Sequence, residues 1–149
     1  MKLRAIYAQI VNELFNMEIK IDTKEKFTVV SPLLTNLTVN IAAEIVENCL
    51  KQLDNPVKNV ILQMEKVHEI EDAAAVQIAE LQQQFYEKSA SFVICSLSEQ
   101  VESVFEKMEL LDFLNSTPTE SEAWDIVQME EIERELMDSD DIEFENNPE

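Results

Sequence analysis

Two spacings of apolar residues alternate along this 149-residue chain, and they predict strands and helices in turn. Residues 1–16 repeat apolar side chains at helical spacing, which predicts an amphipathic N-terminal helix or extension. Residues 18–22 then alternate like a half-buried strand, and residues 27–30 predict a second short strand, followed by a turn at Ser31-Pro32. The remaining predicted elements are helix 39–53, strand 57–64, helix 73–88, strand 91–95, helix 98–108, a short strand near Asn115 and a helix introduced by Pro118. Helix 73–88 is expected to bury Ala74, Ile78, Leu81 and Phe85, and the last helix is expected to have Ala123, Ile126, Val127 and Ile132 on its inner face.

Strands that alternate with helices of about fifteen residues are typical of βαβ units and a mostly parallel sheet. The prediction is a single α/β domain over residues 17–136, with four to five strands and four helices. Residues 137–149 are acidic and show no apolar periodicity, which predicts a disordered acidic tail. Met17 is a second candidate start of the chain, so the place of residues 1–16 stays open at this point.

The chain contains no glycine and carries a formal net charge of -20. Standard P-loops, dinucleotide fingerprints, EF-hands and nucleophile elbows all need glycine, so these sites are excluded. The negative charge argues against binding nucleic acid or an anionic membrane, and it suits a protein partner with a basic surface. The N-terminal segment is too polar for a secretory signal and no apolar run has transmembrane length, so a cytoplasmic location is expected.

Side chains that do chemistry are scarce in this sequence. His68 is the only histidine and is expected to be a solvated loop residue. Cys49 and Cys95 stand in apolar runs, which predicts buried free thiols. Glu71 and Asp72 stand before a predicted helix and are expected to cap that helix. We therefore predict no enzyme activity, no metal site and no cofactor.

Several strings, in this order and at this spacing, resemble the STAS domain, the fold of anti-sigma factor antagonists. The resemblance runs from about Met17 to Ile132. Each string is weak alone, and their order makes them specific. They are Phe27-Thr28-Val29-Val30 with Leu37-Thr38 and Asn40; Val60-Ile61-Leu62-Gln63-Met64 with Val67 and Ile70; Phe92 to Leu97 with Ser98, Val101 and Phe105; and Leu110-Leu111-Asp112-Phe113-Leu114 with Pro118-Thr119 and Glu122-Ala123.

In antagonists of this family, the loop before the second long helix carries Asp-Ser-Ser/Thr-Gly, and phosphorylation of its second hydroxyl residue switches off binding to an anti-sigma factor kinase. The matching string here is Glu71-Asp72-Ala73-Ala74, and Ala73 at the acceptor position has no hydroxyl. Because no Ser or Thr occurs from residue 39 to 88, no phosphorylation is expected in this loop. Two alternatives stay open: Glu69, Glu71 and Asp72 imitate a phosphorylated state, or Ala73 and Ile70 form a small apolar patch that is always open.

The resemblance implies a non-enzymatic, cytoplasmic regulatory protein that binds another protein, such as an anti-sigma factor or serine kinase-type protein. One alternative is a small-molecule or nucleotide-binding module, although an acidic loop without glycine is a poor phosphate cradle. The other is a self-associating scaffold subunit that uses residues 1–16 and the acidic tail. The implied partner-binding residues lie at three strand–helix junctions: Glu69, Ile70, Glu71, Asp72, Ala73 and Ala74, with Leu37 and Thr38, and with Leu97 and Ser98.

Overall fold

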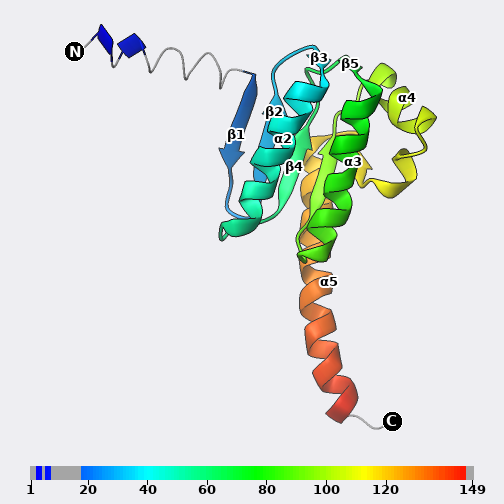
Figure 1. Ribbon diagram of the computed structural model, residues 1–149. Helices are drawn as coiled ribbons and strands as arrows, with labels where there is room; N and C mark the ends of the chain where they lie inside the picture. Colours follow the sequence, from blue (N-terminus) through cyan, green and yellow to red (C-terminus); the bar gives the residue numbers. More distant parts are fainter. Residues whose placement is uncertain (1–2, 5, 8–17, 147–149) are drawn as a thin grey trace.

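A computed structural model describes residues 3–4, 6–7 and 18–146 of the chain. At its centre is a five-stranded sheet in the order β1-β2-β4-β6-β7, shown in Figure 1. Strand β1 is antiparallel to β2, and the pairs β2–β4, β4–β6 and β6–β7 are parallel, which confirms the predicted α/β fold. The strands are β1 (Ile19–Thr23), β2 (Thr28–Pro32), β4 (Val60–Gln63), β6 (Phe92–Cys95) and β7 (Ser116–Thr117).

Helices cover both faces of this sheet. Helices α2 and α3 lie side by side on one face, and α5 runs along the other face and continues past the edge of the sheet (Figure 1). Helix α4 packs beside α3. The helices are α2 (Val39–Lys51), α3 (Asp72–Glu87), α4 (Glu99–Lys107) and α5 (Glu120–Asn146), with 3₁₀ turns η1 (Gln52–Asp54) and η2 (Leu111–Phe113).

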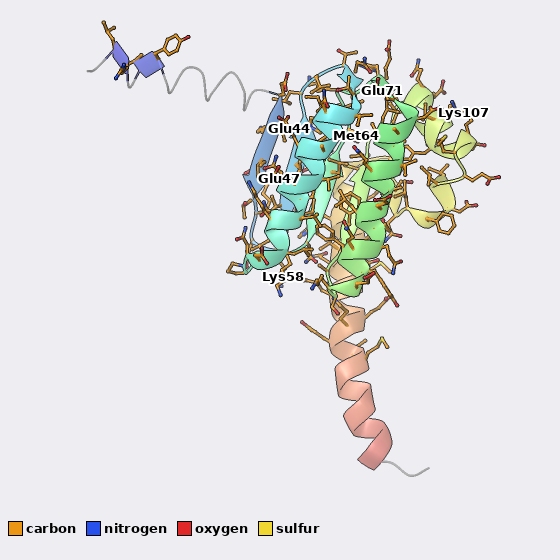
Figure 2. The ribbon with its side chains drawn as sticks, in the orientation of Figure 1. Glu44, Glu47, Lys58, Met64, Glu71 and Lys107 are labelled. Atoms are coloured by element: carbon orange, nitrogen blue, oxygen red, sulfur yellow. The ribbon has the colours of Figure 1, made fainter. Side chains whose placement is uncertain are left out.

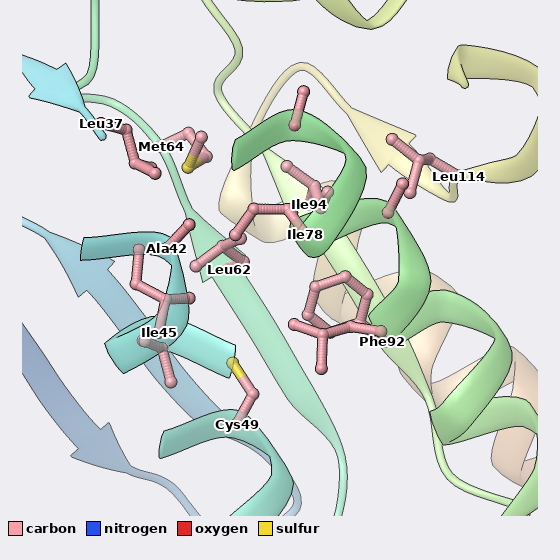
Figure 3. Close-up of a cluster of buried hydrophobic side chains, with 14 of the residues drawn as sticks. Leu37, Ala42, Ile45, Cys49, Leu62, Met64, Ile78, Phe92, Ile94 and Leu114 are labelled. Atoms are coloured by element: carbon pink, nitrogen blue, oxygen red, sulfur yellow. The ribbon is translucent and has the colours of Figure 1, made fainter. Parts of the chain in front are cut away.

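The central strands are apolar throughout because both of their faces are covered. Along β4, Val60 and Leu62 belong to the larger core under α2 and α3, while Ile61 between them belongs to the core under α5. Strand β6 alternates in the same way, with Phe92 on the first face and Val93 on the second. Figure 3 shows the larger core between the two helices and the sheet. This period of two is what two-sided burial requires of a strand.

Most of the predicted helix faces are buried as expected, with one exception. Helix α3 buries Ile78 and Phe85, and the Phe85 ring lies 5.4 Å from that of Phe92. Helix α5 buries Val127, but Ile132, which the sequence places on the same inner face, is 54% exposed. That placement is wrong because Ile132 lies about 140° around the helix from Val127, on the side that faces solvent.

Both cysteines are buried free thiols, as predicted. Burial raises the pKa of the Cys49 thiol, and it raises the pKa of Cys95 to about 11. A raised thiol pKa keeps the sulfur protonated at neutral pH, so neither side chain has the thiolate that nucleophilic chemistry needs.

Helices α3 and α4 end in left-handed residues although the chain has no glycine. Ser89 follows α3 with φ 56°, and Glu109 follows α4 with φ 61°. After α4, the Leu110 amide donates to the Phe105 carbonyl at 2.8 Å, which completes a Schellman motif. Glycine is the usual residue at such a position, so Ser and Glu are held there by the capping hydrogen bonds.

Two predicted boundaries differ from the observed ones, and a third prediction lies mostly outside the described residues. The predicted turn at Ser31-Pro32 is wrong, since β2 runs to Pro32, which pairs with Ile19. Proline fits there because the β2–β4 pairing already ends at Val30, so its missing N–H removes no bond to β4. Helix α5 continues to Asn146, where the sequence predicts a disordered tail from residue 137. Most of residues 1–16, predicted as a helix or extension, lies outside the described residues.

Candidate functional site

The three predicted junctions meet at one edge of the sheet, where β2, β4 and β6 end; we call this the carboxyl edge. Two short strands that the sequence did not predict, β3 (Asn36–Leu37) and β5 (Glu69–Ile70), pair there in parallel. Their register places Leu37 opposite Ile70, and α4 packs against β5. The starts of α2, α3 and α4 are thereby brought together, as Figure 1 shows.

The candidate binding residues divide into buried and accessible ones. Leu37 is fully buried, Ile70 is nearly so and Ala74 is fully buried, so these three side chains form the floor of the carboxyl edge and do not face solvent. The accessible group consists of Glu69, Glu71, Asp72 and Ala73, which are exposed, and Thr38, Leu97 and Ser98, which are half-buried.

Glu71 joins the starts of two helices. It stands immediately before α3, yet its side chain does not cap α3. Its Oε1 instead accepts a hydrogen bond from the Val39 amide at 2.7 Å, at the first residue of α2 (Figure 2). The Thr38 hydroxyl accepts from the Ile41 amide of the same turn. The expectation that Glu71 caps its own helix is therefore wrong; it satisfies an amide of the neighbouring helix.

Asp72 is paired with a lysine from the third helix. The Lys107 ammonium lies 3.1 Å from Asp72 Oδ1 and 3.2 Å from Oδ2, and both side chains are more than half exposed. Lys107 stands at the last residue of α4, where a positive charge also complements the helix dipole. This ion pair links α4 to the start of α3. Sequence reasoning missed Lys107 because 35 positions separate the two residues and no local pattern links them.

The third junction is built around two serines. Ser98 caps α4 as its position predicts, since its Oγ accepts from the Val101 amide at 3.2 Å. Ser96, two residues earlier, has φ 63° and lies in the left-handed region that favours glycine. Its amide donates to the Thr117 carbonyl at 3.1 Å, which ties this turn to β7. A polar residue directly after a buried strand in a glycine-free chain was the only signal for Ser96.

His68 lies in the loop between β4 and β5, at the carboxyl edge. His68 is exposed, and its amide donates to the Thr35 carbonyl at 2.8 Å. In the described part of the chain, no three His, Cys, Asp or Glu side chains converge on one point. No described helix combines the length and apolar character needed to cross a membrane.

The opposite edge, where β4 and β6 begin, is called the amino edge here, and it contains a polar network. Asn59 is 4% exposed and receives a hydrogen bond from the buried Ser91 amide at 2.9 Å. Its Nδ2 donates to Glu131 at 2.8 Å and to the Lys26 carbonyl at 3.1 Å. Arg134 of α5 donates to both Asn59 and Ser91. A cavity of about 550 Å³ opens beside this network, away from the carboxyl edge.

The comparisons with known proteins agree with this architecture. The STAS domain profile matches residues 18–123. The chain belongs to the STAS domain family. This match spans both sheets and the helices up to the start of α5, so it includes the whole carboxyl edge. No curated protein sequence matches the chain.

Solved structures with the same fold include anti-sigma factor antagonists. A Thermotoga maritima protein described as such an antagonist superposes with a TM-score of 0.66 at 18% identity, covering 74% of this STAS chain and 94% of that one. A Planctomyces limnophilus anti-sigma-factor antagonist domain protein gives 0.61 at 18% identity, covering 70% and 93%. Unphosphorylated SpoIIAA of Bacillus gives 0.61 at 16% identity, covering 74% and 96%. At these identities the likeness establishes the fold.

Proposed function

We propose that this STAS protein is a non-enzymatic regulator that binds another protein through its carboxyl edge, without a phosphoserine switch. The observation that carries the proposal is the state of the Glu71-Asp72-Ala73-Ala74 string. Ala73 is exposed and directly follows two carboxylates, Glu71 and Asp72, that are bonded to other parts of the chain, and it offers no hydroxyl for phosphorylation. The surface at the position of the family's phosphorylated residue is therefore small and apolar.

The contacts of the two carboxylates favour an open docking patch over a permanent imitation of phosphate. A phosphate group adds nearly two negative charges that are free to repel or recruit a partner. Here Glu71 is hydrogen-bonded to the start of α2 and Asp72 forms an ion pair with Lys107, so both carboxylates already have partners within the chain. Because Ile70 and Ala74 are buried, the proposed patch consists of the exposed Ala73 together with the half-buried Thr38 and Leu97 of the other two junctions.

The acidic rim of the patch supports a partner with a basic surface. Glu69, Glu99 and Glu102 are exposed around the carboxyl edge, and the whole chain carries a net charge of -20. Opposite charges across an interface accelerate encounter and suppress wrong partners. An anti-sigma factor or serine kinase-type protein with a basic docking face fits this requirement. The cytoplasmic location expected from the sequence stays a prediction.

Binding of a small molecule at the same edge receives less support. Cavities of about 550 and 510 Å³ lie toward the amino edge, where Arg134 lines both of them. Neither cavity includes a residue of the candidate binding group, so the accessible part of the carboxyl edge is better suited to a protein surface than to an enclosed ligand.

A charge-matched pair of variants tests the proposal. Ala73→Arg fills the patch while leaving the Glu71 and Asp72 contacts in place, and Gln84→Arg adds the same charge at an exposed position near the other end of α3. In affinity capture from extract of the source cells, followed by mass spectrometry, we expect the wild type and Gln84→Arg to retain one regulatory protein. We expect Ala73→Arg to capture at least tenfold less of this protein, because a bulky charged side chain in the core of an interface excludes the partner.

Equal capture by Ala73→Arg and Gln84→Arg would contradict binding at this edge. Circular dichroism of both variants checks that the loss of capture is not a loss of fold.

A further inference from the structure

Helix α5 has apolar side chains on two opposite faces. The face toward the sheet buries Ala123 and Val127. On the other side Met129, Ile132 and Leu136 are 59%, 54% and 53% exposed. These three residues, which we call the outer stripe, follow the i, i+3, i+7 spacing of one helix face.

Hydrogen bonds fix the rotation of α5 so that the outer stripe faces away from the domain. At about 100° per residue, Leu136 lies about 180° around the helix from Val127 and about 160° from Arg134. Arg134 is bonded to Ser91 and Asn59 at the amino edge, and Glu130 accepts from Asn115 at 3.0 Å. The stripe therefore cannot turn inward without breaking this network. Figure 1 shows that α5 continues past the edge of the sheet.

The charge around the outer stripe selects its partner. Residues 120–137 contain seven acidic residues against Arg134 alone. Two outer stripes facing each other would bring two strongly negative helices together, which costs free energy through like-charge repulsion. The occupant must instead be an apolar helix face that is neutral or positive.

The same chain contains a segment with these properties. In residues 1–16, apolar side chains recur at helical spacing through Leu3, Ile6, Ile10 and Leu14, and Lys2 and Arg4 outnumber the single acid. Leu3 and Ile6, which are among the described residues, are 82% and 51% exposed. The chain thus has two segments with an apolar stripe and opposite net charge, and Leu3 and Ile6 of the first are exposed like the outer stripe.

We propose that residues 1–16 of one molecule bind the outer stripe of α5 in a second copy of the chain, and that the two copies exchange these segments reciprocally. Strand β1 begins at Ile19, which pairs with Pro32 at the carboxyl edge, whereas the outer stripe lies at and beyond the amino edge. The N-terminal segment joins the sheet at the end opposite the stripe of its own molecule, which favours a second copy. Reciprocal exchange closes a two-fold dimer with two identical contacts.

The mass of the full-length chain in solution tests the dimer. By sedimentation equilibrium we expect a wild-type dimer, and at least a tenfold weaker dimer for Ile132→Ser/Leu136→Ser and for Ile6→Ser/Ile10→Ser. Phe113→Ser is the matched control, because Phe113 is an apolar residue of η2 that is 72% exposed. This variant should dimerise like the wild type. All substitutions keep the charge, and circular dichroism verifies the fold.

Mixing the two weakened double variants identifies the contact. In the mixture, the intact outer stripe of Ile6→Ser/Ile10→Ser can bind the intact residues 1–16 of Ile132→Ser/Leu136→Ser. Heterodimers should therefore form at concentrations at which neither variant dimerises alone. A monomeric wild type would overturn the proposal, because the stripe would then be free, covered within the molecule or reserved for a different protein. Retained dimers in Ile6→Ser/Ile10→Ser would show that two α5 helices pair with each other. Retained dimers in Ile132→Ser/Leu136→Ser would show that two N-terminal segments pair. Either result contradicts the proposed exchange.

Discussion

The two edges of the sheet are built from different kinds of contact. At the amino edge, one buried amide side chain, Asn59, is bonded to Lys26, Ser91, Glu131 and Arg134. At the carboxyl edge the buried layer is apolar, and the contacts of Glu71 and Asp72 lie above it in solvent, each with a single partner residue. The helices α2, α3 and α4 start at the second edge, while α5 is fastened at the first.

This difference bears on the proposed division between an edge that stabilises the domain and an edge that binds a partner. Buried polar groups that satisfy one another are costly to disturb, because removing one leaves the others without partners in a dry environment. Exposed single contacts can be replaced by water at little cost, so a surface made of them can meet a partner and release it. The amino edge is therefore suited to stabilising the domain, and the carboxyl edge is suited to the reversible protein binding proposed above. Three substitutions measure the contrast.

Asn59→Ala should have the largest effect. It removes both the acceptor of the buried Ser91 amide and the donor to Glu131 and Lys26, so unsatisfied groups remain in the interior. We expect the free energy of unfolding in urea to fall by about 3 kcal/mol. Asn48→Ala, which removes an exposed contact within α2, is the control and should change stability by less than about 0.5 kcal/mol. Equal effects of the two would remove the distinction between the edges.

Glu71→Ala should have an intermediate effect. The Val39 amide loses its 2.7 Å acceptor but becomes accessible to water, so we expect a loss of about 1 kcal/mol, as for a typical helix cap. Hydrogen exchange in the first turn of α2 should accelerate, while the last turn, near Lys51, should be unchanged. Glu69→Ala, which removes an exposed acid next to this position, serves as the control. Acceleration along all of α2 would contradict a local capping role.

Lys107→Ala should have the smallest effect. Its ion pair with Asp72 is more than half exposed on both sides, so water and salt screen it, and we expect a change below about 0.5 kcal/mol in urea unfolding. Raising the salt concentration should shrink even this difference. A loss as large as that of Asn59→Ala would mean that α4 is held rigidly to α3, which would argue against an adaptable carboxyl edge.

Regular elements with strong periodicity were predictable from the sequence, and the small pieces that build the site were not. The continuous apolar run Val60-Ile61-Leu62 indicates a strand buried on both faces, because each of its residues faces one of the two cores. Strands β3 and β5 have two residues each, too few for any period. Their pairing depends on the packing of Leu37 and Ile70 beneath the helix starts.

The candidate site shows the same division. The resemblance located the Glu71-Asp72-Ala73-Ala74 string, and the missing hydroxyl at Ala73 follows from the sequence alone. What Glu71 and Asp72 contact does not follow from it, because Val39 and Lys107 are more than thirty positions away along the chain. Their roles depend on how three helices approach one another.

The sequence by itself therefore determined the α/β class, the two-sided burial of the central strands, the absence of glycine-dependent sites and the absence of a phosphate acceptor at Ala73. Those properties depend on residue identity and local spacing. The tertiary structure alone decided that Ile70 and Ala74 are buried, that Glu71 caps α2 and that Ile132 faces solvent on α5. Each of these depends on which surfaces meet when distant segments pack, and pairwise contacts across the fold leave no periodic trace in the chain.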